Sequence, residues 1–224
     1  HKENRSLYER IERIVEERLE VAGINVSPHE FFPVDTRQKN SLDLIKEQIG
    51  ADWDSGVKRV SNRKHDDITR YAVSEYMKQL ESKKKSNLYS YAGFESLINI
   101  SSGMIRYFLE PASRMFAELE SRKKENITFI PCDLQDAIIK KWSEEYILID
   151  FEKMKNDQTT RSHTEKTDKV DQLRNLIEAL CTVFRIKLLS DDSERRFISF
   201  MLTKKPNSDL NDILDLAVEW GYLN

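Results

Sequence analysis

The fold is decided by residues 89 to 116, which read YSYAGFESLINISSGMIRYFLEPASRMF. Apolar residues recur at helical spacing on both sides of a Ser-Ser-Gly interruption at residues 101–103. This pattern predicts a helix capped by Ser90, a sharp turn, and a second helix over residues 104–119. Pro111 lies inside the second helix, so we expect a kink or a break near Leu109.

The sequence on either side predicts more helices. Apolar residues repeat at helical spacing over 5–22, 131–147 and 170–189, and shorter helices are expected from Ser41 to Gly50 and from Ser208 to Gly221. Residues 67–81 suit a helix or a short strand running into a helix. The stretch VSPHEFFPVD, residues 26–35, reads as a proline-bounded loop with two exposed phenylalanines. Residues 51–67 show no period and also read as loop.

The C-terminal third has a different pattern. Residues 152–169 are almost wholly polar, which indicates a linker or a domain boundary. After the helix over 170–189, the stretch RRFISFMLT at 195–203 has strand composition and precedes the last helix. Helix, strand and helix in this order are typical of a winged-helix domain, whose wing would follow Asn224; a plain helical bundle is the alternative.

Composition narrows the class of protein. Of the 224 residues, 33% are charged and 39% hydrophobic, and the mean hydropathy is −0.63. No apolar run approaches the roughly 18 residues that a membrane span needs, and the N-terminus is charged where a signal peptide would be apolar. We therefore expect a cytoplasmic protein with no membrane partner.

Several kinds of chemistry are not indicated. The six glycines are scattered, and no Gly-x-x-x-x-Gly-Lys-Ser/Thr phosphate-binding loop is present. Cys132 and Cys181 are far apart in the sequence and are expected to be buried, reduced thiols, and the four histidines are isolated. The sequence thus predicts no metal site and no catalytic residue in this chain.

Residues 101–142 resemble the lid of AAA+ ATPases of the origin-recognition and initiator type, which include bacterial relatives in phage-defence systems. That lid has a helix, a turn ending in Gly-x-x-Arg, a second helix, a short Ile-Thr segment and a third helix. Here the turn is Gly103 to Arg106, and the short segment is Ile127-Thr128. In that family a winged-helix domain follows the lid, so the resemblance extends over residues 89–224.

The resemblance implies that Arg106 is the sensor-2 arginine, which reaches from the lid to the terminal phosphates of ATP. An arginine in the first turn of a helix opposes the helix dipole, so an anionic partner is expected there. The alternative is an arginine that closes the turn onto Glu95 or Glu110. Because the phosphate-binding loop is absent and residue 1 is not Met, we expect a piece of a longer ATPase. Its partner is then a missing nucleotide-binding domain, with ATP and magnesium in the parent protein and none in this chain.

DNA binding by the C-terminal part is less clearly indicated. Residues 168–224 hold eight Lys or Arg against ten Asp or Glu, and the last helix carries Asp209, Asp212, Asp215 and Glu219. Such a helix would repel phosphates. If duplex DNA binds, we expect weak contacts from Arg195, Arg196, Lys204 and Lys205; protein contacts or self-association are the alternative.

These observations predict a mainly helical chain in which a lid-like helical bundle is followed by a small winged-helix-like domain. The expected segments are a helical segment over 1–82, the lid-like domain over 83–152, a linker over 153–169 and the winged-helix-like domain over 170–224. The predicted function is the lid and DNA- or protein-binding portion of an ATPase. A helical interaction or scaffold protein without a nucleotide role is the alternative, and a phosphate-binding loop upstream in the gene would exclude it.

Overall fold

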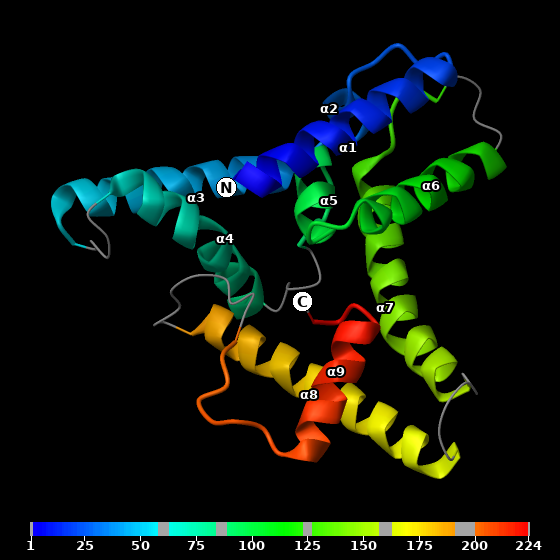
Figure 1. Ribbon diagram of the computed structural model, residues 1–224. Coiled ribbons are helices and arrows are strands. Elements are labelled where there is room, and N and C mark those ends of the chain that lie inside the picture. Colours follow the sequence, from blue (N-terminus) through cyan, green and yellow to red (C-terminus); the bar gives the residue numbers. More distant parts are fainter. Residues whose placement is uncertain are drawn as a thin grey trace. The chain divides into compact units, whose positions relative to one another are not determined.

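The computed structural model describes residues 2–57, 63–83, 89–122, 127–156, 163–190 and 200–223. Within these ranges all regular secondary structure is α-helical, which confirms the mainly helical class (Figure 1). The helices are α1 (Lys2–Val21), α2 (Pro28–Phe31), α3 (Thr36–Ser55), α4 (Lys64–Ser82), α5 (Phe94–Ile100), α6 (Ile105–Ser121), α7 (Cys132–Asn156), α8 (His163–Leu189) and α9 (Ser208–Glu219). None of the helices in the described ranges is both long enough and apolar enough to cross a membrane.

The chain divides into two compact units that alternate along the sequence. The first unit contains residues 1–41 and 87–144, and the second contains residues 42–86 and 145–224. Each has its own hydrophobic core. The four consecutive segments expected from the sequence remain a prediction.

The core of the first unit is built from one face each of α1, α5, α6 and α7, together with α2. The apolar period of α1 buries Ile11, Val15 and Leu19, as its sequence predicts. These side chains belong to the same cluster as Met115 of α6 and Ile139 of α7. Gly23 ends α1 with a φ of +71°, the left-handed conformation that favours glycine at this position.

The two phenylalanines at 31 and 32 are buried, which corrects the prediction of an exposed loop. Phe31 ends the short helix α2, whose start is fixed by a capping box between Ser27 and Glu30. The Phe32 ring lies edge-on to Phe31 at 5.0 Å and to Phe108 at 5.8 Å between centroids. Hydrophobic burial therefore overrides the proline-rich local sequence.

Three predicted helix starts are also wrong by a few residues. α3 begins at Thr36 rather than Ser41, because the Asp35 carboxylate accepts a hydrogen bond from Arg37 N at 2.9 Å. It also runs on to Ser55, through residues expected to form a loop. The cap of α5 is Gly93 rather than Ser90, and the cap of α9 is Asn207 rather than Ser208.

Pro111 does not break α6, which is continuous from Ile105 to Ser121. The proline removes one N–H from the helix, and its ring is buried in the apolar face that α6 presents to the core. Packing of that face compensates for the lost hydrogen bond.

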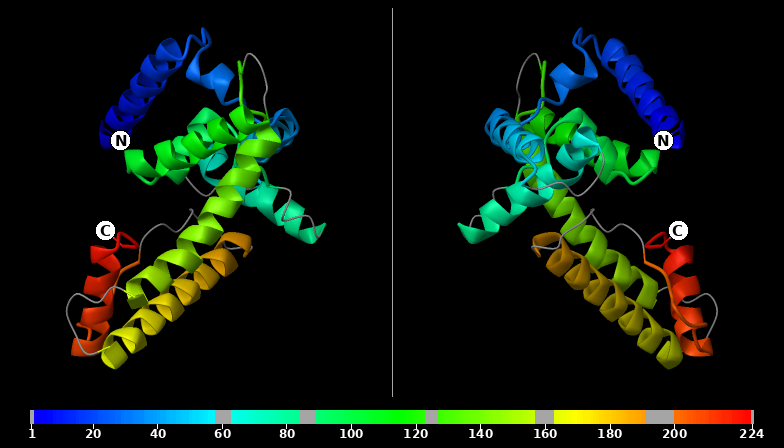
Figure 2. Two further views of the ribbon diagram at one scale, coloured as in Figure 1. Left: turned by 90° about the vertical axis from the view of Figure 1, so that its right-hand side faces the viewer. Right: turned by 90° about the vertical axis from the view of Figure 1, so that its left-hand side faces the viewer.

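The core of the second unit joins α8 and α9 to the C-terminal end of α7 (Figures 1 and 2). Phe151 and Met154 of α7 are buried with Leu173 of α8 and Ile213 of α9. Residues 153–156 and 163–169 are therefore helical, where the sequence predicted a linker. α8 leaves Val183 53% exposed, although the apolar spacing of the helix expected over 170–189 predicts that this residue is buried.

Only the end of the predicted strand at 195–203 lies within the described residues. Residues 200–203 are not in a strand, and the rest of the unit's described regular structure is helical. A single extended segment needs a neighbouring strand to form a ladder, and the described residues provide none. The winged-helix assignment is thus not confirmed. Tyr222 closes the end of α9 by stacking on Phe151, with ring centroids 5.0 Å apart.

Candidate functional site

The turn between α5 and α6 is held by its own backbone. Ser101 is fully buried, and its hydroxyl donates to Ile98 O at 2.6 Å. Met104 N donates to Ser101 O at 2.9 Å, which closes the turn. Between them Ser102 and Gly103 have φ values of +50° and +90°. The Ser-Ser-Gly sequence therefore makes a fixed reversal of the chain, and α6 begins directly after it.

Arg106 lies in the first turn of α6, as predicted, and its side chain is 83% exposed. Its Nε is 3.8 Å from Oε2 of Glu110, one helical turn further on. Of the two acidic neighbours considered from the sequence, Glu110 is thus the one beside the guanidinium. The distance is beyond hydrogen-bond range, so the pair is a loose electrostatic contact.

The other oxygen of Glu110 is bound more closely. Oε1 of Glu110 accepts a hydrogen bond from a terminal nitrogen of Arg114 at 3.0 Å. Arg106, Glu110 and Arg114 therefore form one row along α6 at i, i+4 and i+8. The unfavourable position of Arg106 at the positive end of the helix dipole is only partly offset by this row.

Aromatic packing fixes the neighbouring part of α6 against α7. The Tyr107 ring lies edge-on to Trp142 at 5.7 Å between centroids, and Trp142 is only 8% exposed. Phe108 is buried against Phe94 of α5 at 5.7 Å. These contacts of the two residues that follow Arg106 hold the helix start in place while the Arg106 guanidinium extends into solvent.

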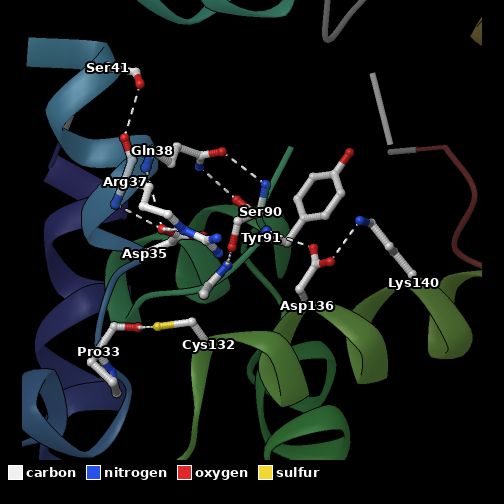
Figure 3. A network of polar contacts seen from close by, with 11 residues as sticks. Pro33, Asp35, Arg37, Gln38, Ser41, Ser90, Tyr91, Cys132, Asp136 and Lys140 are labelled. Atoms are coloured by element: carbon white, nitrogen blue, oxygen red, sulfur yellow. Dashed lines mark hydrogen bonds and ion pairs between the residues drawn. The ribbon is translucent and has the colours of Figure 1, made fainter. Parts of the chain in front are cut away.

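A polar network ties the segment before α5 to the start of α3 (Figure 3). The Gln38 side chain accepts a hydrogen bond from Ser90 N at 2.8 Å and donates one to Ser90 O at 2.7 Å. Tyr91 N donates to Asp136 on α7 at 3.0 Å, and Lys140 holds that carboxylate at 2.7 Å. The chain entering α5 is therefore fixed from two sides.

Gln135 provides a third attachment. Its side-chain oxygen accepts from Gly93 N at 2.9 Å, and its side-chain nitrogen donates to Ile130 O at 2.8 Å and to Pro33 O at 3.1 Å. The residue is fully buried. One amide thus satisfies three backbone groups from three segments of the chain. Sequence reasoning missed both glutamines, because an amide in an amphipathic helix carries no signal of its tertiary partners.

The cysteines partly differ from their predicted state. Cys132 is half-buried, and its Sγ donates to Pro33 O at 3.4 Å. Burial and the nearby Asp35 charge raise the pKa of the Cys132 thiol. Cys181 is exposed rather than buried. Within the described ranges, no group of three or more His, Cys, Asp or Glu side chains could hold a metal ion.

The basic residues predicted for DNA contact are only partly described. Arg195 and Arg196 lie outside the described residues. Lys204 and Lys205 are exposed in the irregular segment before α9. On α9, Asp212 forms an ion pair with Lys169 of α8, whereas Asp209 and Asp215 face solvent. The structure therefore places the two lysines before the first residue of a helix whose charged residues are all acidic.

This arrangement is a helical module with an arginine exposed at the first turn of α6. A family model described as ORC-CDC6-like matches residues 53–224, well over half of the chain. The chain belongs to the ORC-CDC6-like family. The match includes the α5–α6 turn and every helix from α4 to α9. Searches of curated proteins and of solved structures gave no match.

Proposed function

We propose that this chain is the lid and C-terminal portion of an ATPase of the origin-recognition and CDC6 type. In this proposal Arg106 senses the terminal phosphates of ATP, which is bound together with magnesium by a nucleotide-binding domain outside the chain. The observation that carries it is the exposed Arg106 guanidinium, fixed at a helix start by the turn at residues 101–104. The resemblance to bacterial relatives makes phage defence the candidate setting for the parent ATPase.

The geometry supports this role in two ways. A guanidinium can bind two phosphate oxygens at once through its planar fork of N–H groups. Arg106 keeps these donors available, since its contact with Glu110 is long and lies in solvent. The buried contacts of Tyr107 and Phe108 fix the backbone from which it extends. A phosphate reached from this position would meet a preorganised positive charge.

ATP turnover by the complete ATPase tests the proposal. Arg106→Ala should lower turnover about 10- to 100-fold, because a preorganised donor to the reacting phosphates is lost. Arg122→Ala is the matched control, since Arg122 is also an exposed arginine paired with a glutamate one turn away, Glu118, but at the other end of α6. It should turn over ATP like the wild type. Unchanged turnover of Arg106→Ala would refute the sensor role.

The rival function is a scaffold without a nucleotide role. It requires that the complete protein contain no phosphate-binding loop and bind no ATP. Equilibrium binding of a fluorescent ATP analogue to the complete protein separates the two functions. Binding of the analogue with a dissociation constant in the micromolar range would exclude the scaffold function. Absence of binding at millimolar concentrations of the analogue would favour it.

For the second unit we propose a weak, salt-dependent contact with duplex DNA through Arg195, Arg196, Lys204 and Lys205. What supports it is the exposure of the two lysines before α9. The double variant Lys204→Glu and Lys205→Glu should then reduce DNA binding in low salt. Lys83→Glu with Lys187→Glu makes the same charge change at other exposed sites of that unit and should have less effect. Equal loss in both variants would point to net charge alone.

A further inference from the structure

The carboxylate of Glu110 is shared by two arginines, and the two contacts are unequal. Its Oε1 accepts a direct hydrogen bond from Arg114 at 3.0 Å, while its Oε2 is 3.8 Å from Arg106 Nε. The Arg114 side chain is 40% exposed and that of Arg106 is 83% exposed. The closer and less hydrated pair therefore holds the carboxylate away from Arg106.

Because of this geometry, the Glu110 carboxylate competes with any bound anion for the guanidinium of Arg106. A side-chain rotation would bring Glu110 fully onto Arg106, because residues at i and i+4 on a helix are neighbours. The guanidinium would then have fewer N–H groups for a ligand. Arg114 opposes that rotation from the next turn of the same helix face, since it already binds the carboxylate.

We infer that Glu110 is a positioning residue that sets how available Arg106 is to the phosphates, and that Arg114 keeps Arg106 available by holding Glu110. The inference rests on the proposed sensor role of Arg106. It predicts that substitutions of Glu110 and Arg114 change nucleotide affinity in opposite directions, although the two residues lie in the same row along α6. Loss of the Glu110 charge strengthens nucleotide binding, and loss of the Arg114 charge weakens it.

The expected effects are modest because all three side chains are at least one-third exposed. Exposed ion pairs change an equilibrium by up to about fivefold. Glu110→Gln should therefore lower the dissociation constant about two- to fivefold, and Arg114→Ala should raise it by a similar factor. Arg114→Lys keeps the positive charge and should stay near the wild-type value. The double variant with Glu110→Gln and Arg114→Ala should behave like Glu110→Gln, since no carboxylate remains to compete.

The experiment measures the affinity of the complete ATPase for a non-hydrolysable fluorescent ATP analogue at low salt. Each variant is made both in the wild type and in an Arg106→Ala background. If Glu110 acts through Arg106, neither Glu110→Gln nor Arg114→Ala changes affinity when Arg106 is absent. Thermal unfolding of each variant shows whether a change in affinity comes from loss of folded protein.

The outcomes separate this inference from the proposed function. If Arg106→Ala binds and turns over nucleotide like the wild type, or if no nucleotide binds, the proposed function fails and the inference fails with it. The inference alone is overturned if Arg106→Ala is impaired but Glu110→Gln and Arg114→Ala leave the nucleotide affinity unchanged. It is also overturned if these two substitutions change the affinity in the same direction. Effects that persist in the Arg106→Ala background would also overturn it.

Discussion

Gln38 and Ser90, 52 residues apart in the sequence, are joined by two hydrogen bonds of 2.7 and 2.8 Å. The amide of Gln38 pairs with both backbone groups of Ser90, as a neighbouring strand would. Ser90 is only 7% exposed, so water would replace these bonds poorly. This pair fixes the chain that leads into α5 and the turn before Arg106.

Gln38→Leu should therefore destabilise the protein by about 1–3 kcal/mol, because two buried backbone groups lose their partner. Gln48→Leu on the same helix is the matched control, since the side chain of Gln48 is exposed and donates to Asp52 in an exposed hydrogen bond. It should stay within about 0.5 kcal/mol of the wild type. Urea unfolding followed by circular dichroism measures both, and equal midpoints would contradict a structural role for the pair.

Gly93→Ala should be more costly than an ordinary glycine substitution. Gly93 has a φ of +110°, and an added Cβ would lie 2.6 Å from Cγ1 of Val34. Strain and overpacking together should cost about 2–4 kcal/mol. Gly23→Ala, at a φ of +71° with open space, should cost only about 1 kcal/mol. Adding Val34→Ala to Gly93→Ala should restore part of the loss in thermal unfolding; no recovery would mean that the contact is unimportant.

Phe32→Ala should be among the most destabilising single changes, at about 3–5 kcal/mol. Its ring is 3% exposed and packs on Phe31 and Phe108. Phe129→Ala removes the same atoms from a side chain that is 52% exposed, so it should cost less than about 1 kcal/mol. Comparable unfolding midpoints for the two variants would contradict the burial of Phe32.

The two thiols should react with Ellman's reagent in separate phases. Cys181 is exposed, whereas Cys132 is half-buried with a raised pKa caused by burial and by the charge of Asp35. The fast phase should disappear in Cys181→Ser, and the slow phase should accelerate as the pH rises through the range in which the Cys132 thiol ionises. A single fast phase from both thiols would contradict the burial of Cys132.

Asp35 should make the first unit sensitive to acid. Burial raises the pKa of its carboxyl, but hydrogen bonds from Arg37 and Gln38 outweigh burial, and the net pKa is lowered from 3.8. A lowered pKa means that the stabilisation is complete above the ordinary value and is lost as the pH falls through the lowered one. Asp35→Ala should cost about 1 kcal/mol at pH 7, as loss of a helix cap does, and less as the pH falls below 3.8 and the carboxylate is protonated. A cost independent of pH would exclude the charged cap.

The helices with a clear apolar period were predictable from sequence, and the reason lies in residues such as Ile11, Val15 and Leu19. Their spacing alone marks the buried face of α1. The same holds for α6, whose apolar period buries Phe108, Met115 and Leu119, and for the arginine at its start. The local apolar pattern is sufficient to predict a helix and its buried face wherever one face of that helix packs in one hydrophobic core.

Prediction failed where distant residues decide the structure. Phe31 and Phe32 sit among prolines, and only the core that they enter makes them buried. Gln135 satisfies three backbone groups that the sequence does not connect. The polar residues 163–169 are helical because Val170 and Leu173, which follow them, anchor α8 in the second core. Each miss is a tertiary contact that overrides a local preference.

The alternation of the two units along the chain has a consequence for synthesis. The buried face of α1, which ends at Leu19, packs in a cluster that also needs Ile139 of α7. Ribosomes add about 5–20 residues per second, so roughly 6–24 seconds pass between these two residues. During that time the apolar stripe of α1 lacks its partner on α7. The nascent chain therefore exposes part of the amphipathic face of α1 until the residues of α7 that cover it have been added.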